Sequence, residues 1–86
     1  MTRKDRIIKK ISDNVDFEEL EVLNNSHLHK GHSGDDGTLE THYKITIKSD
    51  YLNNLSKVNA HKQINKAVKD EFDSGLHALE IKLVRN

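Results

Sequence analysis

The chain of 86 residues contains no cysteine. It can therefore form no disulfide, and it offers neither a cysteine nucleophile nor the thiolates that hold most iron–sulfur clusters. No run of ten apolar residues occurs either, which argues against a signal peptide or a membrane span. The aromatic side chains, two tyrosines and two phenylalanines, are too few to suggest a platform for stacking bases. We expect a cytoplasmic protein.

The sequence also lacks a net charge, because 14 acidic side chains balance 14 basic ones. Without an overall field, binding to nucleic acid or to a membrane would require a local basic patch. Hydrophobic residues make up 34% and charged residues 33% of the chain, but the apolar residues recur periodically, which indicates a folded protein. A chain of this length predicts one domain, over residues 1–86.

The N-terminal part of the chain predicts a helix and a short strand. Thr2 and Asp5 have the spacing of a capping box, with Asp5 in place of the usual Glu or Gln. The apolar residues that follow fall on one helical stripe: Ile7, Ile8, Ile11 and Val15. In residues 19–25, Leu20 and Val22 share one face, which is typical of a strand.

The rest of the chain predicts a loop, a strand, a long helix and a last strand. Three glycines mark residues 26–38 as a loop. Residues 40–49 alternate between apolar and polar side chains, as a half-buried strand does. From Lys57 to about Phe72 the period is helical, and Gly75 would end this helix. The apolar stripe of the helix is Val58, His61, Ile64, Val68 and Phe72. The residues of the last strand that share a face are His77, Leu79, Ile81 and Leu83.

The element order, α-β-β-α-β, predicts an α+β fold with helices on one face of a three-stranded mixed sheet. Because a helix connects the second and third strands, we expect these strands to run parallel, with a right-handed crossover. Parallel strands begin at the same end of a sheet, so His42 and His77, which open them, should lie at one rim. The loop with His27, His29 and His32 leads into this rim, where five histidines would meet.

The residues alone leave the role of these histidines open. Imidazoles can ligate a metal or transfer protons near neutral pH, but a glycine-rich loop is often only a solvated connection. Zinc binding by the rim without a partner is another possibility. His77 could also be a partly buried, hydrogen-bonded residue at the start of its strand. We expect His42 on the surface beside Lys44, and His61 as a hydrogen-bonded core residue.

Four segments of the sequence resemble the BolA family, and their order agrees with it: LEVLNNSHLH, ETHYKITIKSDYL, HKQINKAVKDEF and GLHALEIKL. The last two are similar to the characteristic helix of the family and to its closing V-H-A-L strand. The resemblance implies a class II KH-like (BolA-like) fold. Two positions depart from the family pattern. Phe-x-Gly reads Tyr51-Leu52-Asn53, and Arg-His-Arg reads Ala60-His61-Lys62, so the helix has lost both arginines.

This resemblance implies an adaptor that pairs with a monothiol glutaredoxin in iron–sulfur cluster assembly, trafficking or iron regulation. The two proteins would share a [2Fe–2S] cluster, for which glutaredoxin and glutathione supply thiolates and the BolA-like protein supplies histidine. The matching ligand in the closing strand is His77. In the loop His29 matches best, and His27 or His32 could substitute. The chain alone is expected to be a monomer, and the complex a heterodimer.

The lysines of the long helix suggest a different function. Lys62, Lys66 and Lys69 lie on one face that could contact DNA, and transcriptional regulation is also associated with the family. Acidic residues on the same helix and the lack of a Gly-x-x-Gly loop weigh against this alternative. We do not expect an enzyme, because the sequence contains no nucleophile elbow, phosphate loop or paired carboxylates.

Overall fold

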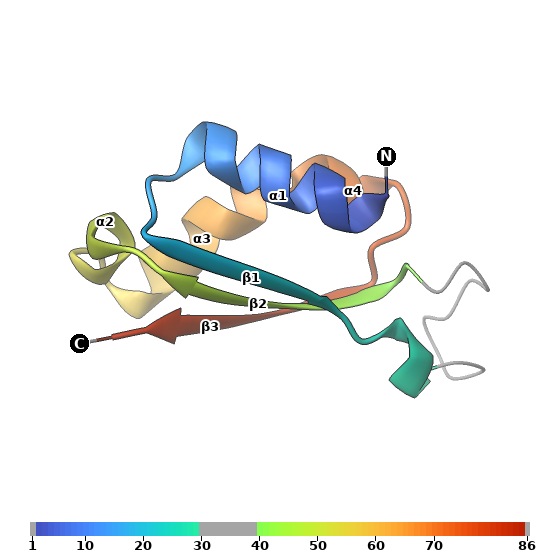
Figure 1. Ribbon diagram of the computed structural model, residues 1–86. Coiled ribbons are helices and arrows are strands. Elements are labelled where there is room, and N and C mark those ends of the chain that lie inside the picture. Colours follow the sequence, from blue (N-terminus) through green and yellow to red (C-terminus); the bar gives the residue numbers. More distant parts are fainter. Residues whose placement is uncertain (1, 30–39, 86) are drawn as a thin grey trace.

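The structure is a computed structural model that describes residues 2–29 and 40–85. Figure 1 shows the elements in chain order. They are α1 (Arg3–Asn14), β1 (Glu19–Asn24), the 3₁₀ helix η1 (Ser26–His29), β2 (His42–Lys48), α2 (Asp50–Asn53), α3 (Lys57–Ala67), α4 (Lys69–Asp73) and β3 (Ala78–Val84). The predicted α+β class and element order are confirmed.

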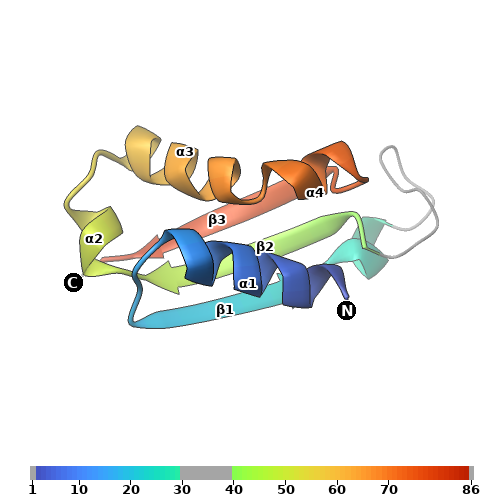
Figure 2. The same cartoon turned by 90° about the horizontal axis from the view of Figure 1, so that it is seen from above.

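The three strands form one mixed sheet in the order β1-β2-β3. β1 runs antiparallel to β2, with Val22 opposite Ile45, and β2 runs parallel to β3, with Ile45 opposite Ile81. The helices α1, α3 and α4 lie on one face of the sheet, α1 above β1 and β2 and α3 on the side of β3 (Figures 1 and 2). The parallel pairing of the last two strands is therefore confirmed, and it fixes which residues share the rim.

The core lies between the sheet and the helices. Alternation along β2 buries Tyr43, Ile45 and Ile47 on the helix side. The largest apolar side chains that are fully buried are Ile7, Ile11, Ile45, Ile47, Leu52, Ile64 and Val68. Each such side chain stabilises the fold by about 1.5–3 kcal/mol through removal of apolar surface from water. No helix in the described ranges is long and apolar enough to cross a membrane.

The start of α1 agrees with the sequence prediction. The Asp5 main-chain N–H donates to Thr2 Oγ1 at 3.2 Å, and the Thr2 N–H donates to Asp5 Oδ2 at 3.3 Å. These bonds form a complete capping box and satisfy main-chain donors that the first helical turn leaves open. Ile7, Ile11 and Val15 are buried as predicted, whereas Ile8 lies at the exposed edge of the stripe.

The long helix differs from the prediction in two respects. It is interrupted at Val68, whose φ of −107° and ψ of 18° are not helical, so α3 ends there and α4 begins. The buried stripe of α3 runs through Ala60 and Ile64, four residues apart, instead of through Val58. Val58 is 63% exposed, because a position two residues from Ala60 falls on the far side of the helix.

A buried carboxylate joins α4 to α1. Glu71 Oε1 lies 3.0 Å from Arg6 Nε and 3.4 Å from Arg3 Nε, and Lys10 Nζ donates to Glu71 Oε2. Burial on its own would raise the pKa of Glu71, but hydrogen bonds from Lys10 and Arg6 and their positive charges hold this pKa below its ordinary value. One carboxylate thus compensates three cations of the first helix.

Candidate functional site

The parallel pairing of β2 and β3 brings two histidines together at one rim of the sheet. His42 opens β2, and His77 directly precedes β3. Their ring centroids are 5.3 Å apart, and the ring planes are tilted by 48°. The predicted meeting of these two side chains is therefore found in the structure.

The main chain on both sides of His77 fixes its position. Gly75 has a φ of 125°, a left-handed conformation that glycine adopts without strain, and it turns the chain out of α4. The next side chain, Leu76, is buried in the core. The His77 N–H donates to the Thr41 carbonyl at 2.8 Å. His77 is exposed, so the alternative of a partly buried His77 is wrong, and the residue is accessible to a partner.

His42 does not lie on the surface, contrary to the sequence prediction. The residue is only 6% exposed, and its Nδ1 lies 2.8 Å from Thr41 Oγ1. Its strand parity places it on the open face of the sheet, but η1 packs against this end of β2 and covers it. His42 is therefore a buried neighbour of the exposed His77.

Ser26 holds η1 against the rim, and its role was not apparent from the sequence. This buried side chain accepts hydrogen bonds from the Thr41 and His42 N–H groups at 2.9 and 3.0 Å, and it donates to the His42 carbonyl at 3.3 Å. The Ser26 N–H donates to Asn24 Oδ1 at 2.9 Å. This Asx turn is the only local signal that the sequence offers for the connection.

The loop histidines are only partly described by the structure. His27 lies on η1 and its side chain is exposed. The main chain of His29 ends η1, while its side chain and the whole of His32 lie outside the described residues. η1 nevertheless joins this segment to the rim beside His42, as the sequence predicted. Which loop imidazole approaches His77 stays a prediction.

Arg3 connects the two segments that lead to the rim. Its guanidinium is buried and donates to the Glu40 carbonyl at 2.6 Å and to the Ser74 carbonyl at 3.0 Å. The Arg3 N–H donates to Glu40 Oε1 at 3.0 Å. Glu40 lies two residues before His42, and Ser74 three residues before His77. The start of α1 therefore helps to hold both histidine segments in place.

The described residues of the rim offer ligands for part of a metal centre. The described residues contain no group of three or more His, Asp or Glu side chains that could hold a metal ion. Exposed His77 can supply one neutral nitrogen ligand, and the loop can supply another. A centre that takes further ligands from another molecule fits His77 and the described part of the rim.

The predicted lysine surface is present on the helix layer. Lys62 and Lys66 are exposed and lie four residues apart on α3, and Lys69 is exposed at the start of α4. His61 on α3 is half-buried. Its Nε2 is buried and has no hydrogen-bond partner within residues 2–29 and 40–85, so the prediction of a hydrogen-bonded core histidine is wrong.

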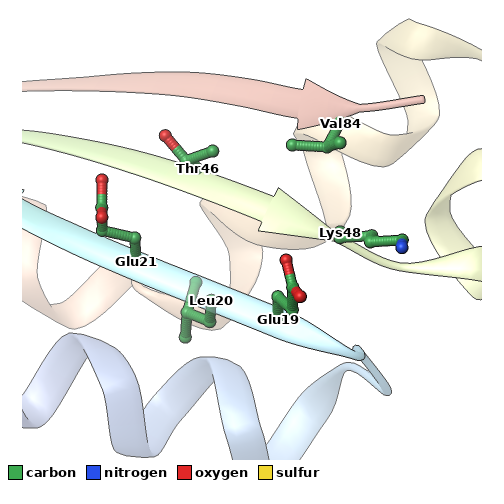
Figure 3. A pocket seen from close by; sticks show the side chains of 6 residues that line it. All are labelled: Glu19, Leu20, Glu21, Thr46, Lys48 and Val84. Atoms are coloured by element: carbon green, nitrogen blue, oxygen red, sulfur yellow. The ribbon is translucent and has the colours of Figure 1, made fainter. Parts of the chain in front are cut away.

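A hollow on the sheet lies far from the histidines. Figure 3 shows its lining side chains, which are Glu19, Leu20, Glu21, Thr46, Lys48 and Val84. These residues belong to the start of β1 and the ends of β2 and β3, at the opposite end of the sheet from His42 and His77. The hollow contains no histidine, so the rim remains the candidate site.

Comparison with known proteins agrees with this fold. A family model described as BolA-like protein matches residues 11–85. The BolA domain of SufE1 from Arabidopsis thaliana is 41% identical and has a TM-score of 0.83, with 96% of this chain and 91% of that chain covered.

Two curated relatives carry functional names. The chain is 36% identical to the DNA-binding transcriptional regulator BolA of Vibrio cholerae over 78 residues, which covers 91% of this chain and 70% of that protein. It is 43% identical over 82 residues to SufE-like protein 1, chloroplastic/mitochondrial, of Arabidopsis thaliana, which covers 88% of this chain but 22% of that protein. Since that relative belongs to organelles, a cytoplasmic location stays a prediction.

Proposed function

The chain belongs to the BolA-like protein family, and from this membership we propose that it is an adaptor that shares a [2Fe–2S] cluster with a monothiol glutaredoxin. The cluster would serve iron–sulfur assembly, trafficking or iron regulation. The observation that carries the proposal is exposed His77, whose ring centroid lies 5.3 Å from that of buried His42, beside the segment that bears His29. This arrangement offers histidine ligands to a partner and contains no thiolate.

The residues of this chain would place histidine ligands where the cluster of the partner can reach them. The Thr41 carbonyl anchors the main chain of His77, and η1 carries His27 and the main chain of His29 at the rim. His29 would be the loop ligand, with His27 or His32 as substitutes. Glutaredoxin and glutathione would supply the thiolates. The cluster would contribute iron exchange and one-electron chemistry, with a potential raised by histidine ligation. Because a protonated imidazole cannot bind metal, ligation should weaken as pH falls.

We expect His77→Ala to abolish the effect of this protein on the cluster of the glutaredoxin. Visible absorption and circular dichroism are recorded for glutaredoxin, glutathione, iron and sulfide, with and without the chain. Wild type should change the spectrum of the glutaredoxin cluster, because histidine nitrogens from His77 and the loop replace thiolate ligands. His77→Ala should leave that spectrum unchanged, and His29→Ala should reduce the change.

The matched control is His61→Ala, which removes a histidine on α3 and should behave as wild type once far-UV dichroism shows that it folds. If wild type itself leaves the spectrum unchanged, the proposed ligation is wrong. If His77→Ala changes the spectrum as wild type does, the cluster is bound elsewhere.

A second candidate function is DNA binding through the exposed Lys62, Lys66 and Lys69 side chains. The name of the Vibrio cholerae relative favours it, whereas the net charge of zero does not. On this alternative, affinity for duplex DNA falls steeply with salt, and Lys62→Ala and Lys66→Ala each reduce the salt slope by about one. His77→Ala and Lys82→Ala would have no effect. Salt titrations of the five proteins therefore separate the two functions.

A further inference from the structure

The outer edge of β3 is open to pairing. β3 is the last strand of the sheet. Ala78 lies opposite His42 and donates its N–H to the Thr41 carbonyl at 3.1 Å. In a parallel ladder the next residue faces the other way. The main-chain groups of Leu79, Ile81 and Leu83 therefore point away from β2, and they have no partner within the described residues.

The side chains along this edge are incompletely covered. On the helix side, Leu79, Ile81 and Leu83 pack against the core but are only partly buried. A groove runs along the edge and is lined by Lys57, Glu80, Ile81, Lys82, Leu83 and Arg85. On the open face, Glu80 and Lys82 are exposed. An edge with unpaired main-chain groups and apolar side chains is a template for another strand.

We propose that β3 pairs antiparallel with β3 of a second copy of this chain, about a two-fold axis at Ile81. In this register Ile81 lies opposite Ile81, and Leu79 opposite Leu83 of the second copy. These are the residues whose main-chain groups point outward, so they exchange the hydrogen bonds. Glu80 then lies opposite Lys82 of the second copy in a non-hydrogen-bonded pair, where side chains approach most closely.

The charged side chains favour this register over the two registers whose axes lie one residue away. An axis at Glu80 would place Glu80 opposite Glu80, and an axis at Lys82 would place Lys82 opposite Lys82. Like charges directly opposite each other destabilise strand pairing. The axis at Ile81 instead forms two opposite-charge pairs, because each copy supplies one acid and one base.

The other edge of the sheet is unsuited to the same contact. β1 exposes Glu19 and Glu21, and an axis at Leu20 would set these two acids against each other. Pairing of β1 of one copy with β3 of the next would leave a free strand edge at each end, so the assembly would grow into an open chain of copies. The β3 contact closes as a dimer, and its short ladder predicts association that depends on concentration. The chain would then be a monomer only when dilute, which differs from the prediction that the chain alone is a monomer.

Sedimentation velocity over a series of concentrations tests the proposal with the full chain. Wild type should shift from monomer to dimer as concentration rises. Glu80→Lys and Lys82→Glu each convert both cross-strand pairs to like charges, and each should raise the dissociation constant about tenfold or more. The control Glu21→Lys makes the same change of charge on β1 and should dimerise as wild type.

An equimolar mixture of Glu80→Lys and Lys82→Glu gives the sharpest result. One copy then carries two lysines and the other two glutamates at positions 80 and 82, so both pairs become attractive again and a heterodimer should form. The proposal is overturned if wild type stays monomeric at every concentration. It is also overturned if a wild-type dimer persists unchanged in both variants, or if the mixture restores no association.

Discussion

Replacement of Glu71 by glutamine is expected to lower the free energy of unfolding by about 3 kcal/mol. The carboxylate lies within ion-pair distance of Arg3, Arg6 and Lys10. Glutamine keeps the size of the side chain but removes its charge. The main effect is therefore electrostatic, since three cations lose their common counter-charge.

The exposure of the three cations sets the size of this effect. The side chains of Arg6 and Lys10 are 34% and 27% exposed, so both can turn toward water when the carboxylate is lost. The side chain of Arg3 is 7% exposed and is held by main-chain carbonyls of Glu40 and Ser74. Arg3 alone would remain a buried charge without a carboxylate, which places the loss near the lower end of the usual range of about 3–5 kcal/mol.

Urea unfolding followed by far-UV dichroism measures the loss. Asp73→Asn is the matched control, because it removes an exposed carboxylate from the same short helix and should change stability by less than about 0.5 kcal/mol. A domain of this size has a total stability of roughly 4–13 kcal/mol, so a loss of 3 is easily seen. Equal stability of the two variants would show that the ion pairs do not stabilise α1 on α4.

The same variant should also change the response to acid. Because the pKa of folded Glu71 lies below its ordinary value of 4.5, its charge contributes stability that is complete above this pH. That contribution is lost as pH falls below 4.5, through the pKa of the folded state. The difference in stability between wild type and Glu71→Gln should therefore shrink from pH 7 toward pH 3. A difference that does not change with pH would contradict this account.

Features that depend on neighbours along the chain could be predicted from the sequence. The capping box of Thr2 and Asp5 and the alternation along β2 were predicted and are present. The parallel pairing of β2 with β3 followed from the helical connection between them. These features need only the period of the side chains and the usual handedness of crossovers.

Features that depend on distant contacts could not be predicted in this way. Glu71 reads as one more acid of a polar helix, and only the packing of α4 against α1 reveals its three partners. His42 has the parity of an exposed strand residue, and only the fold of η1 over the rim buries it. Val58 was placed on the buried stripe, but the stripe runs through Ala60 and Ile64, and only the packed structure shows which face of α3 is buried.

Replacement of Ser26 by alanine is expected to lower the free energy of unfolding by about 2–4 kcal/mol. Its hydroxyl accepts hydrogen bonds from two buried N–H groups, those of Thr41 and His42. Alanine would remove the acceptor that both donors share at the start of β2, and a buried donor that loses its hydrogen bond costs about 1–3 kcal/mol. Ser12→Ala is the control, because Ser12 is an exposed serine on α1 and alanine is slightly favoured in a helix.

Ser26→Ala should lower the stability of the whole domain and, in addition, loosen the structure at the rim. Hydrogen exchange measured by NMR should show reduced protection of the Thr41 and His42 amides in Ser26→Ala. The amide of Ile64 on α3 should lose only as much protection as the fall in global stability requires. Because η1 carries His27 and His29, loosening this contact should also weaken the cluster spectrum formed with glutaredoxin, although no histidine has been changed. Unchanged protection at Thr41 and His42 would show that η1 is held by contacts other than Ser26, and the positioning of the loop histidines would then require another explanation.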